Sequence, residues 1–173
     1  MHMLHLLRHA KSSWKEEVDD HERCLNRRGR EAARRVGQTL PAALGSLDLV
    51  LCSSARRTRE TMELVVAEFA VRPPIVIEDE LYEASKDRLV NRLRRLEEEI
   101  GSILLIGHNP GLHELAMAIA DTKATGFRAL SSGKFPTAAR ASFRIREPWP
   151  AFGRSSYEIA DYVTVDSLRR DRD

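Results

Sequence analysis

The sequence predicts an α/β fold, a three-layer sandwich in which helices cover both faces of a mostly parallel central sheet. Short apolar runs alternate along the chain with segments that repeat apolar residues at helical spacing. The runs are continuous, which is typical of strands buried on both faces of a parallel sheet. Strands that alternate with helices form such a sheet with a layer of helices on each side.

Length and composition indicate one domain. The chain has 173 residues, of which 42% are hydrophobic and 31% charged, as in a globular protein. No repeat or Pro/Gly-rich linker divides it, so we expect a single domain over residues 1–173. No apolar run approaches the roughly 18 residues of a membrane helix. We expect a cytoplasmic protein without membrane contact, because no export signal pattern opens the chain and two cysteines are too few for a disulfide framework.

The expected elements are placed by their patterns. Apolar runs predict strands at residues 3–7, 47–52, 75–77 and 102–106. Helical spacing predicts helices over residues 32–44, 62–69, 89–100 and 112–119. Residues 141–146 are compatible with a further strand, Pro148-Trp149-Pro150 interrupts regular structure, and residues 166–173 form a charged end to which we assign no function.

The charge balance argues against nucleic acid as a partner. The 28 Lys and Arg residues face 26 Asp and Glu residues, which leaves a net charge of only +2. All but five of the cations are Arg. The planar guanidinium fork of Arg matches phosphate and carboxylate groups, so this bias is compatible with an oxyanion ligand.

Two histidines directly follow buried strands and are the candidate reactive groups. His9 comes after the first apolar run, and His108 comes after the run at residues 102–106. Ligands of such folds bind at the carboxyl ends of the strands, so we expect both side chains in one site. Asn109 is predicted to cap a helix that Pro110 begins. The remaining histidines are expected to be structural or to lie at the surface: His2, His5, His21 and His113.

Arginines gather at the same edge of the predicted sheet. Arg8 ends the first strand, and Arg56, Arg57 and Arg59 open the helix after the second. A helix N-terminus with added Arg side chains favours an anion, and phosphate, or sulfate in its place, fits best. Two of the three helix arginines are expected to pair instead with Glu60 and Glu63 on a solvated face.

A histidine beside such cations predicts phosphoryl transfer. A neutral imidazole can take a phosphoryl group and release it to water, with no cofactor and no metal. Positioned cations stabilise the charge on the transferred group. An alkoxide leaving group would also need a general acid, and Glu83, which follows the third strand, is the candidate.

The motifs resemble those of the histidine phosphatase superfamily, and specifically its small SixA-type phosphohistidine phosphatases. Arg8-His9-Ala10 is similar to the family's Arg-His-Gly signature, in which the His takes the phosphoryl group and the Arg binds it. Residues 53–61 resemble the pattern Ser-Pro-x-x-Arg-x-x-x-Thr, whose register selects Arg57 as the second phosphate-binding Arg. Ala10 replaces the family's Gly.

Two further segments carry the resemblance. Gly107-His108-Asn109-Pro110 resembles the region of the family's second phosphate-binding His. The segment Arg23-Cys24-Leu25-Asn26-x-x-Gly29 is similar to one that precedes the family's first helix. The resemblance implies a phosphoglycerate mutase-like fold.

The resemblance also implies a metal-independent phosphatase that forms a phosphohistidine intermediate on His9. Arg8, Arg57 and His108 would bind the phosphoryl group. Ser12 and Lys15 are expected at the rim, as substrate contacts. The implied substrate is phosphohistidine on a protein, since a compact chain leaves little room for a cap over the site.

Two alternatives remain open. The substrate could be a small phosphate ester, with Glu83 as the general acid, because an alkoxide leaves less readily than an imidazole. The chain could also be a module that binds phosphate or a phosphoprotein without turnover. A nucleophile such as His9 is wanted only for transfer, so that residue separates the second alternative from an enzyme.

Other phosphate chemistries are excluded by spacing. A cysteine phosphatase needs Arg after five residues beyond its Cys, but that position from Cys52 is Thr58. The P-loop pattern GxxxxGK[ST] is absent. His113 and Glu114 lack the HExxH continuation of a zinc hydrolase.

Overall fold

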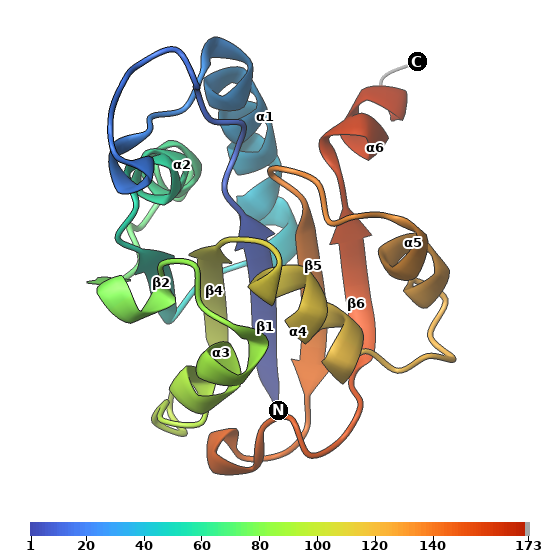
Figure 1. The fold of residues 1–173 in the computed structure, drawn as a ribbon. Helices are drawn as coiled ribbons and strands as arrows, with labels where there is room; N and C mark the ends of the chain where they lie inside the picture. The colour runs from blue at the N-terminus through green and yellow to red at the C-terminus, as the bar shows by residue number, and fades with distance from the viewer. Residues whose placement is uncertain (172–173) are drawn as a thin grey trace.

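Strands and helices alternate along the first two thirds of the chain, as predicted. The computed structural model describes residues 1–171, within which one sheet has six strands in the order β3-β2-β4-β1-β5-β6 (Figure 1). The strands are β1 (His2–Arg8), β2 (Leu49–Ser53), β3 (Ile75–Glu78), β4 (Ser102–Gly107), β5 (Arg140–Ile145) and β6 (Glu158–Val163). The helices are α1 (Arg27–Leu44), α2 (Arg56–Val66), α3 (Lys86–Leu93), α4 (Gly111–Ile119), α5 (Phe127–Ser132) and α6 (Val165–Arg170). Within the same residues, no helix has the length and apolar character needed to cross a membrane.

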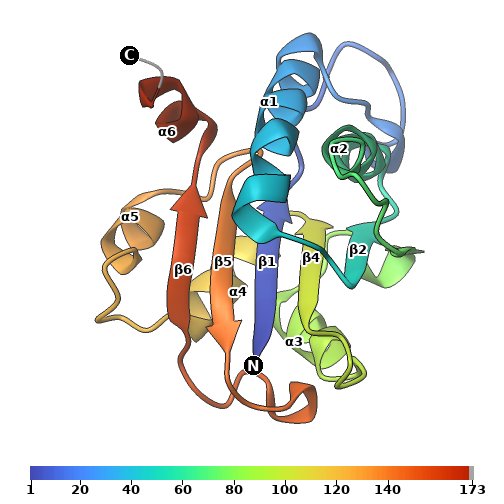
Figure 2. The ribbon, with the colours of Figure 1, turned by 180° about the vertical axis from the view of Figure 1, so that it is seen from behind.

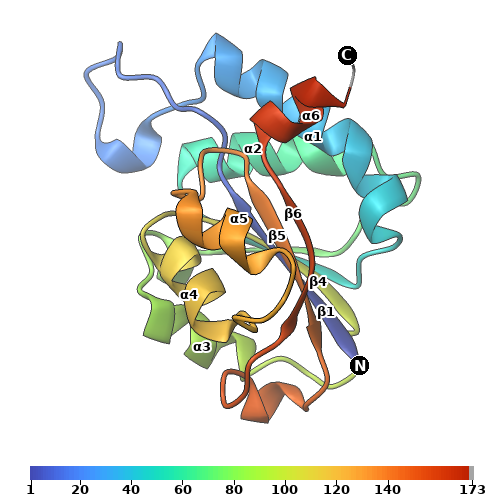
Figure 3. The ribbon, with the colours of Figure 1, turned by 90° about the vertical axis from the view of Figure 1, so that its right-hand side faces the viewer.

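Two apolar cores hold the helices against the sheet. The edge view in Figure 3 shows α1, α2 and α6 on one face and α3, α4 and α5 on the other, and Figure 2 shows the first face from the front. Leu4 and Leu6 of β1 belong to the core under α3 and α4. Leu7 belongs to the core under α1 and α2, because successive side chains of a strand point to opposite faces. The predicted three-layer α/β sandwich is confirmed.

The parallel part of the sheet carries the two histidines. β1 pairs with β4, β4 with β2, and β2 with β3, all in parallel. The register opposes Arg8 to Gly107, so His9 and His108 leave the sheet side by side. β5 is antiparallel to both of its neighbours, β1 and β6, so the parallel arrangement does not extend across the whole sheet.

The last third of the chain holds elements that no pattern predicted. The strand expected at residues 141–146 is β5, but α5, β6 and α6 were not foreseen. Pro148-Trp149-Pro150 interrupts regular structure as expected: it lies between β5 and β6, where Trp149–Ala151 is a three-residue 3-10 turn that buries the Trp149 side chain. The charged end from residue 166 belongs mostly to α6, and its residues 172–173 lie outside the described residues.

Two expected elements differ at their edges. β3 is not buried on both faces: it lies at the edge of the sheet, and Val76 and Ile77 are exposed. α3 ends at Leu93, well before the expected residue 100, although Leu96 beyond it is still buried. Core burial therefore continues past the end of the helix itself.

Candidate active site

A cavity of about 560 Å³ opens at the carboxyl ends of the parallel strands. Its lining includes every site residue predicted from the sequence: Arg8, His9, Ser12, Lys15, Arg57, Glu83 and His108. Asp20 and Thr137 also line the cavity and were not singled out from the sequence, and Arg23, which lines it too, was noted only as part of a segment that resembles the family. A second cavity, of about 660 Å³, lies beside α2 and β3 and is lined by none of these predicted site residues.

His9 is held as a neutral imidazole with one nitrogen unprotonated. Its Nδ1 lies 2.7 Å from the carbonyl oxygen of Ala10, which can only accept, so Nδ1 carries the proton. The side chain is buried. Burial lowers the pKa of His9 to about 4. The hydrogen bond to Ala10 raises this pKa, and the charges of nearby arginines lower it. Nε2 is therefore unprotonated near neutral pH, as a nucleophile must be.

His108 faces His9 inside the cavity, with 5.3 Å between the ring centroids. Its Nδ1 lies 3.4 Å from Nη2 of Arg57, and its Nε2 lies 2.7 Å from Oγ of Ser53. Since a guanidinium can only donate, Nδ1 accepts and the proton is on Nε2. Burial, followed by the neighbouring His9 and Arg57, lowers the pKa of His108 to about 3.

Two guanidinium groups bring fixed positive charge to the cavity. Arg57 is 4% exposed, and its Nη1 donates to the carbonyl oxygen of Asp20 over 2.8 Å. Nη1 of Arg8 donates to the carbonyl oxygen of Phe135 over 3.2 Å. Burial, and then the charge of Arg57, lower the pKa of Arg8, but an Arg of this kind stays protonated.

Each of these guanidinium groups keeps a donor unused. Within residues 1–171, Nε of Arg8 and Nε of Arg57 are buried without a hydrogen-bond partner. An unpaired buried donor costs about 1–3 kcal/mol. Such exceptions in a folded protein call for an explanation, and two guanidinium donors beside one cavity suit an oxyanion.

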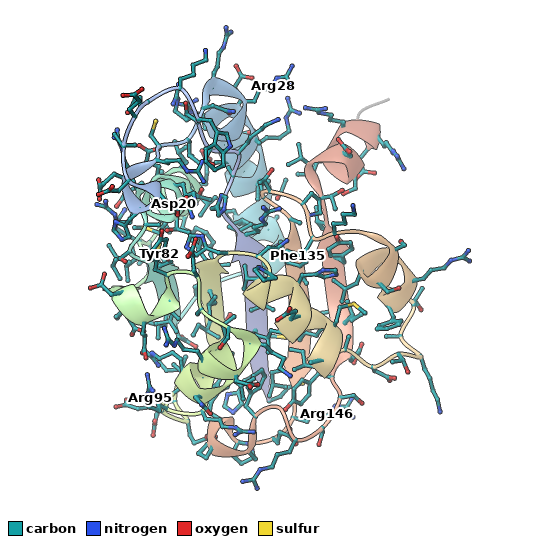
Figure 4. All side chains as sticks on the ribbon, viewed as in Figure 1. Asp20, Arg28, Tyr82, Arg95, Phe135 and Arg146 are labelled. Atoms are coloured by element: carbon teal, nitrogen blue, oxygen red, sulfur yellow. The ribbon has the colours of Figure 1, made fainter. Side chains whose placement is uncertain are left out.

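Asp20 is the central site residue that the sequence analysis missed. Its Oδ1 accepts from Nε of Arg23 over 3.0 Å, and its Oδ2 accepts from Nη2 of Arg57 over 3.1 Å. Oδ2 also accepts from the hydroxyl of Tyr82, which Figure 4 shows next to Asp20. The hydrogen bond from Tyr82, together with those from the two arginines, holds the pKa of Asp20 well below its ordinary value. Burial and Asp20 raise the pKa of Tyr82 to about 12.

Asp20 lies in an acidic stretch of the sequence that looks like an ordinary solvated segment. The one local signal is its position three residues before Arg23, with which it forms an ion pair. Its contact with Tyr82 joins residues 62 positions apart. That contact depends on the fold, so no sequence pattern carries it.

Arg23 fixes the loop that follows β1. Its Nη1 donates to Oγ of Ser12 over 2.6 Å and to the carbonyl oxygen of Ser13 over 3.2 Å. Its guanidinium carbon also lies 3.6 Å from the ring centroid of Trp14. Ser12 is thereby placed on the cavity wall, and Lys15 is exposed at the rim.

The start of α1 packs closely against the same loop. The side chain of Asn26 caps the helix by accepting from the backbone nitrogen of Gly29 over 2.8 Å. A Cβ at Gly29 would lie 2.0 Å from the carbonyl oxygen of Lys11. Any residue other than glycine would therefore clash with the loop. The segment from Arg23 to Gly29 thus holds the loop after β1, which forms one wall of the cavity.

Glu83 lies at the rim with an unusual backbone. Its side chain is exposed, and it lines the cavity. Its φ is 49°, in the left-handed region that residues other than glycine seldom adopt. Strained backbone of this kind gathers at functional sites, and the position keeps Glu83 a candidate proton donor.

One local expectation was wrong and another is only half confirmed. Asn109 does not cap α4: its Nδ2 donates to the carbonyl oxygens of Lys134 and Phe135, both over 2.9 Å, and so ties the β4–α4 loop to the segment before β5. The expectation that two helix arginines pair with glutamates is correct for one, because Arg56 pairs with Glu60 over 3.0 Å. Arg59 donates instead to the carbonyl oxygen of Ser54.

Comparison with known proteins identifies the family. A model of the histidine phosphatase superfamily (branch 1) matches residues 4–99, more than half of the chain. The chain belongs to the histidine phosphatase superfamily. The uncharacterized protein Rv1276c of Mycobacterium tuberculosis (strain ATCC 25618 / H37Rv) is 32% identical over 145 residues, which cover 83% of this chain and 89% of that protein.

Solved structures of the superfamily share the fold. A proposed phosphohistidine phosphatase SixA from Agrobacterium tumefaciens is 28% identical, with a TM-score of 0.78 over 94% of this chain and 97% of that one. The protein histidine phosphatase SixA complexed with tungstate is 19% identical, with a TM-score of 0.77 over 96% of this chain and 99% of that one. The phosphoglycerate mutase-like histidine phosphatase fold and the SixA-type resemblance are confirmed.

The family match covers only part of the site, and the fold brings in the rest. The matched range contains His9, Arg57 and Glu83 but ends before His108. His108 is brought to the site by the parallel pairing of β1 with β4. Among residues 1–171, no three His, Cys, Asp or Glu side chains are grouped so as to hold a metal ion.

Proposed function

We propose that this histidine phosphatase superfamily member is a metal-independent phosphatase that acts through a phosphohistidine intermediate on His9, and that its substrate is phosphohistidine on a protein. One observation carries the proposal. His9 has its proton fixed on Nδ1 by the Ala10 carbonyl, so an unprotonated Nε2 stands in a cavity that is also lined by the half-buried guanidinium of Arg8 and the buried guanidinium of Arg57. That is the combination a phosphoryl acceptor needs.

The first step transfers the phosphoryl group. Nε2 of His9 attacks phosphorus, and the bond from phosphorus to the leaving nitrogen or oxygen breaks with its electron pair going to the leaving group. Arg8 and Arg57 bind the phosphoryl oxygens and stabilise their charge. The same negative charge opposes the burial that lowers the pKa of His108. Nδ1 of His108, which accepts from Arg57 in the free site, can therefore take up a proton and donate it to a phosphoryl oxygen.

The second step returns the enzyme to its starting state. Water attacks phosphorus on the side opposite Nε2, the P–N bond to His9 breaks, and inorganic phosphate leaves. The Ala10 carbonyl holds the imidazole in one orientation through both steps. Ser12 and Lys15, at the wall and rim of the cavity, contact the part of the substrate that stays outside.

A protein substrate is supported by the nature of the leaving group and of the relatives. An imidazole leaves from a P–N bond without a strong acid in the site, and Glu83 is exposed rather than buried beside His9. The similar proteins from Agrobacterium tumefaciens and in the tungstate complex carry the name SixA, a phosphohistidine phosphatase.

We also propose that the chain is one domain that acts in the cytoplasm, where its two cysteines, both unpaired within the described residues, stay reduced.

The second candidate is hydrolysis of a small phosphate ester. The observation that favours it is Glu83, which lines the same cavity on a strained backbone. As a general acid it would protonate an alkoxide as the P–O bond breaks. Glu83→Gln should then reduce ester hydrolysis by about 10²-fold and leave phosphohistidine hydrolysis close to the wild-type rate.

The test compares phosphate release from a phosphohistidine protein and from an aryl phosphate, both in excess chelator, with His9→Ala as the control. Release mainly from phosphohistidine supports the proposal, and strong ester hydrolysis that needs Glu83 supports the second candidate. Wild-type rates in His9→Ala, or activity that chelation abolishes and a divalent ion restores, would refute the mechanism. Phosphate binding with no release from either substrate would show a binding module without turnover.

A further inference from the structure

A basic groove adjoins the catalytic cavity. Its volume is about 240 Å³, and it lies between α1, α6 and the segment that leads into β5 (Figure 1). Lys11 and Thr137 line both the groove and the cavity, so the two hollows share a wall. A chain that places its phosphorylated side chain in the cavity can therefore continue into the groove.

The groove carries an excess of positive charge. The described residues that line it include three cations, Lys11, Arg28 and Arg169, and one carboxylate, Asp166. Arg28 stands near the start of α1, where Figure 4 labels it, and Arg169 lies in the last turn of α6. The whole chain has a net charge of only +2, so this concentration of cations is local.

α6 is fixed in a position that presents its arginine to the groove. Thr164 and Ser167 form a reciprocal capping box at its start, which satisfies the first backbone donors. Val165 and Leu168 pack against the core under α1 and α2. The helix is held by its apolar side, and Arg169 remains 65% exposed in its side chain.

We propose that the groove binds an acidic segment of the phosphorylated protein substrate, next to the residue whose phosphoryl group enters the cavity. This inference rests on the proposed phosphatase function. Small anions require fixed, converging donors, such as those of Arg8 and Arg57. Exposed cations attract charge that is spread along a chain, and act on encounter and partner choice.

The kinetic test uses two synthetic phosphohistidine peptides that differ only in their flanks, glutamates in one and glutamines in the other. The variants are Arg28→Glu and Arg169→Gln. The matched control is Arg34→Glu, an exposed arginine of the same helix that does not line the groove. We expect the wild type to prefer the acidic peptide by about tenfold in kcat/KM at low salt, as a few exposed ion pairs provide.

Each groove variant should lose much of that preference, while Arg34→Glu keeps it. Hydrolysis of an aryl phosphate should be unchanged in all three variants, because none of the three residues lines the catalytic cavity. Added salt should abolish the preference in the wild type, since exposed charges are screened. Equal rates for the two peptides, or the same loss in Arg34→Glu, would overturn the proposal.

A binding measurement separates this inference from the proposed function. The unphosphorylated acidic peptide, carrying a fluorophore, is titrated by anisotropy against the same variants, so no turnover is needed. Charge-dependent binding that Arg28→Glu weakens supports the groove even if no substrate is hydrolysed, and the proposed function alone would then fail. A labelled oligonucleotide that binds through Arg28 and Arg169, with no binding of the acidic peptide, would overturn the assignment to a protein segment.

Discussion

At the scale of single residues, the site depends on which histidine nitrogen carries the proton. The Ala10 carbonyl fixes the proton of His9 on Nδ1, and the Arg57 guanidinium leaves the proton of His108 on Nε2. Two imidazoles 5.3 Å apart are thus given opposite tautomers by neighbours that can only accept or only donate. The sequence places both histidines, but only the fold supplies those neighbours.

The first prediction concerns the protonation of His9. Because its pKa is lowered to about 4, its Nε2 is unprotonated from neutral pH down to that value and protonates below it. We expect kcat/KM for an aryl phosphate, corrected for the ionisation of the substrate, to fall as pH falls through about 4. Nitrogen NMR of the free protein should show the Nδ1–H tautomer of His9 at neutral pH.

The NMR titration also provides the control for the first prediction. The signal of His9 is assigned by its loss in His9→Ala, and folding at each pH is checked by circular dichroism. An Nε2–H tautomer, or a His9 that titrates near its ordinary value, would contradict the geometry on which the nucleophile depends.

The second prediction concerns Asp20. Its carboxylate accepts from Nη2 of Arg57 and from Tyr82, so it holds the guanidinium against the cavity wall. We expect Asp20→Ala to reduce kcat/KM by about tenfold, the effect of losing one charged hydrogen bond that orients a group. Asp20→Asn, which keeps an acceptor, should lose less.

Inhibition by inorganic phosphate decides between two roles for Asp20. If the carboxylate positions Arg57, Asp20→Ala weakens phosphate binding as well as turnover. If it mainly repels the anion, phosphate binds more tightly in that variant. Tighter inhibition would show that Asp20 competes with substrate rather than preparing the site.

At the scale of elements, close approaches of helices to loops shape the cavity. The start of α1 lies against the loop after β1 at Gly29, and the start of α4 lies against the loop after the Asp79–Leu81 turn at Gly111. A Cβ at either glycine would lie 2.0 Å from a backbone carbonyl oxygen. Both glycines therefore allow a helix to pack directly against a cavity-lining loop, although glycine has no side chain that could take part in the chemistry.

The third prediction compares two glycines of α1. Gly29→Ala places a methyl group against the Lys11 carbonyl, which must move together with the loop that carries Ser12. Gly37→Ala places a methyl group 3.0 Å from Cα of Val65. This contact is with α2, and it does not involve the loop that carries Ser12. Both changes add the same helix propensity, so we expect both to alter stability but only Gly29→Ala to reduce kcat/KM strongly.

The measurement pairs urea denaturation with steady-state kinetics on the same preparations. Rates are compared under conditions in which each variant is fully folded. Wild-type kcat/KM in folded Gly29→Ala would show that the loop after β1 has no part in the site.

Sequence patterns predicted the elements whose environment is uniform. β1, β2 and β4 are buried on both faces and read as continuous apolar runs, and their carboxyl ends located His9 and His108. β3 was located but its burial was overestimated, because an edge strand leaves one side open. A short apolar run does not reveal its neighbours in the sheet.

The elements that escaped prediction are short or mixed in character. α5 and α6 have six residues each, too few for a periodic pattern to stand out. β6 joins apolar and charged residues at the free edge of the sheet. Asp20 was missed for a different reason: its partners Arg57 and Tyr82 are distant in sequence, and only the fold assembles them.

At the scale of the whole molecule, three buried histidines make stability depend on pH. His5 is buried in the sheet, where its Nδ1 lies 2.7 Å from Oγ of Ser142, and burial lowers its pKa to about 4. Burial also lowers the pKa of His9 to about 4 and that of His108 to about 3. Within the described residues, these imidazoles are neutral in the fold at pH values where an exposed histidine is protonated.

The fourth prediction follows from the sign of this linkage. Between pH 6.5, the ordinary pKa of histidine, and about 4, the unfolded chain binds protons at these positions that the folded chain does not. Stability therefore falls as pH falls across that range, by several kcal/mol on the order-of-magnitude scale of about 1.4 kcal/mol per unit of pKa shift. Urea denaturation at about pH 7 and about pH 5 should show the loss as a lower midpoint with an unchanged slope.

His5→Gln tests the origin of that loss, because glutamine keeps a hydrogen-bonding side chain beside Ser142 but does not titrate. Its stability should fall less steeply between about pH 7 and about pH 5, by the contribution of one imidazole. Inorganic phosphate should also reduce the dependence on pH, since an anion in the cavity favours protonated His9 and His108 and does not reach His5. Two results would show that the buried imidazoles do not make the fold sensitive to acid. One is equal stability of the wild type at both pH values, and the other is a loss of stability between them that is as large in His5→Gln as in the wild type.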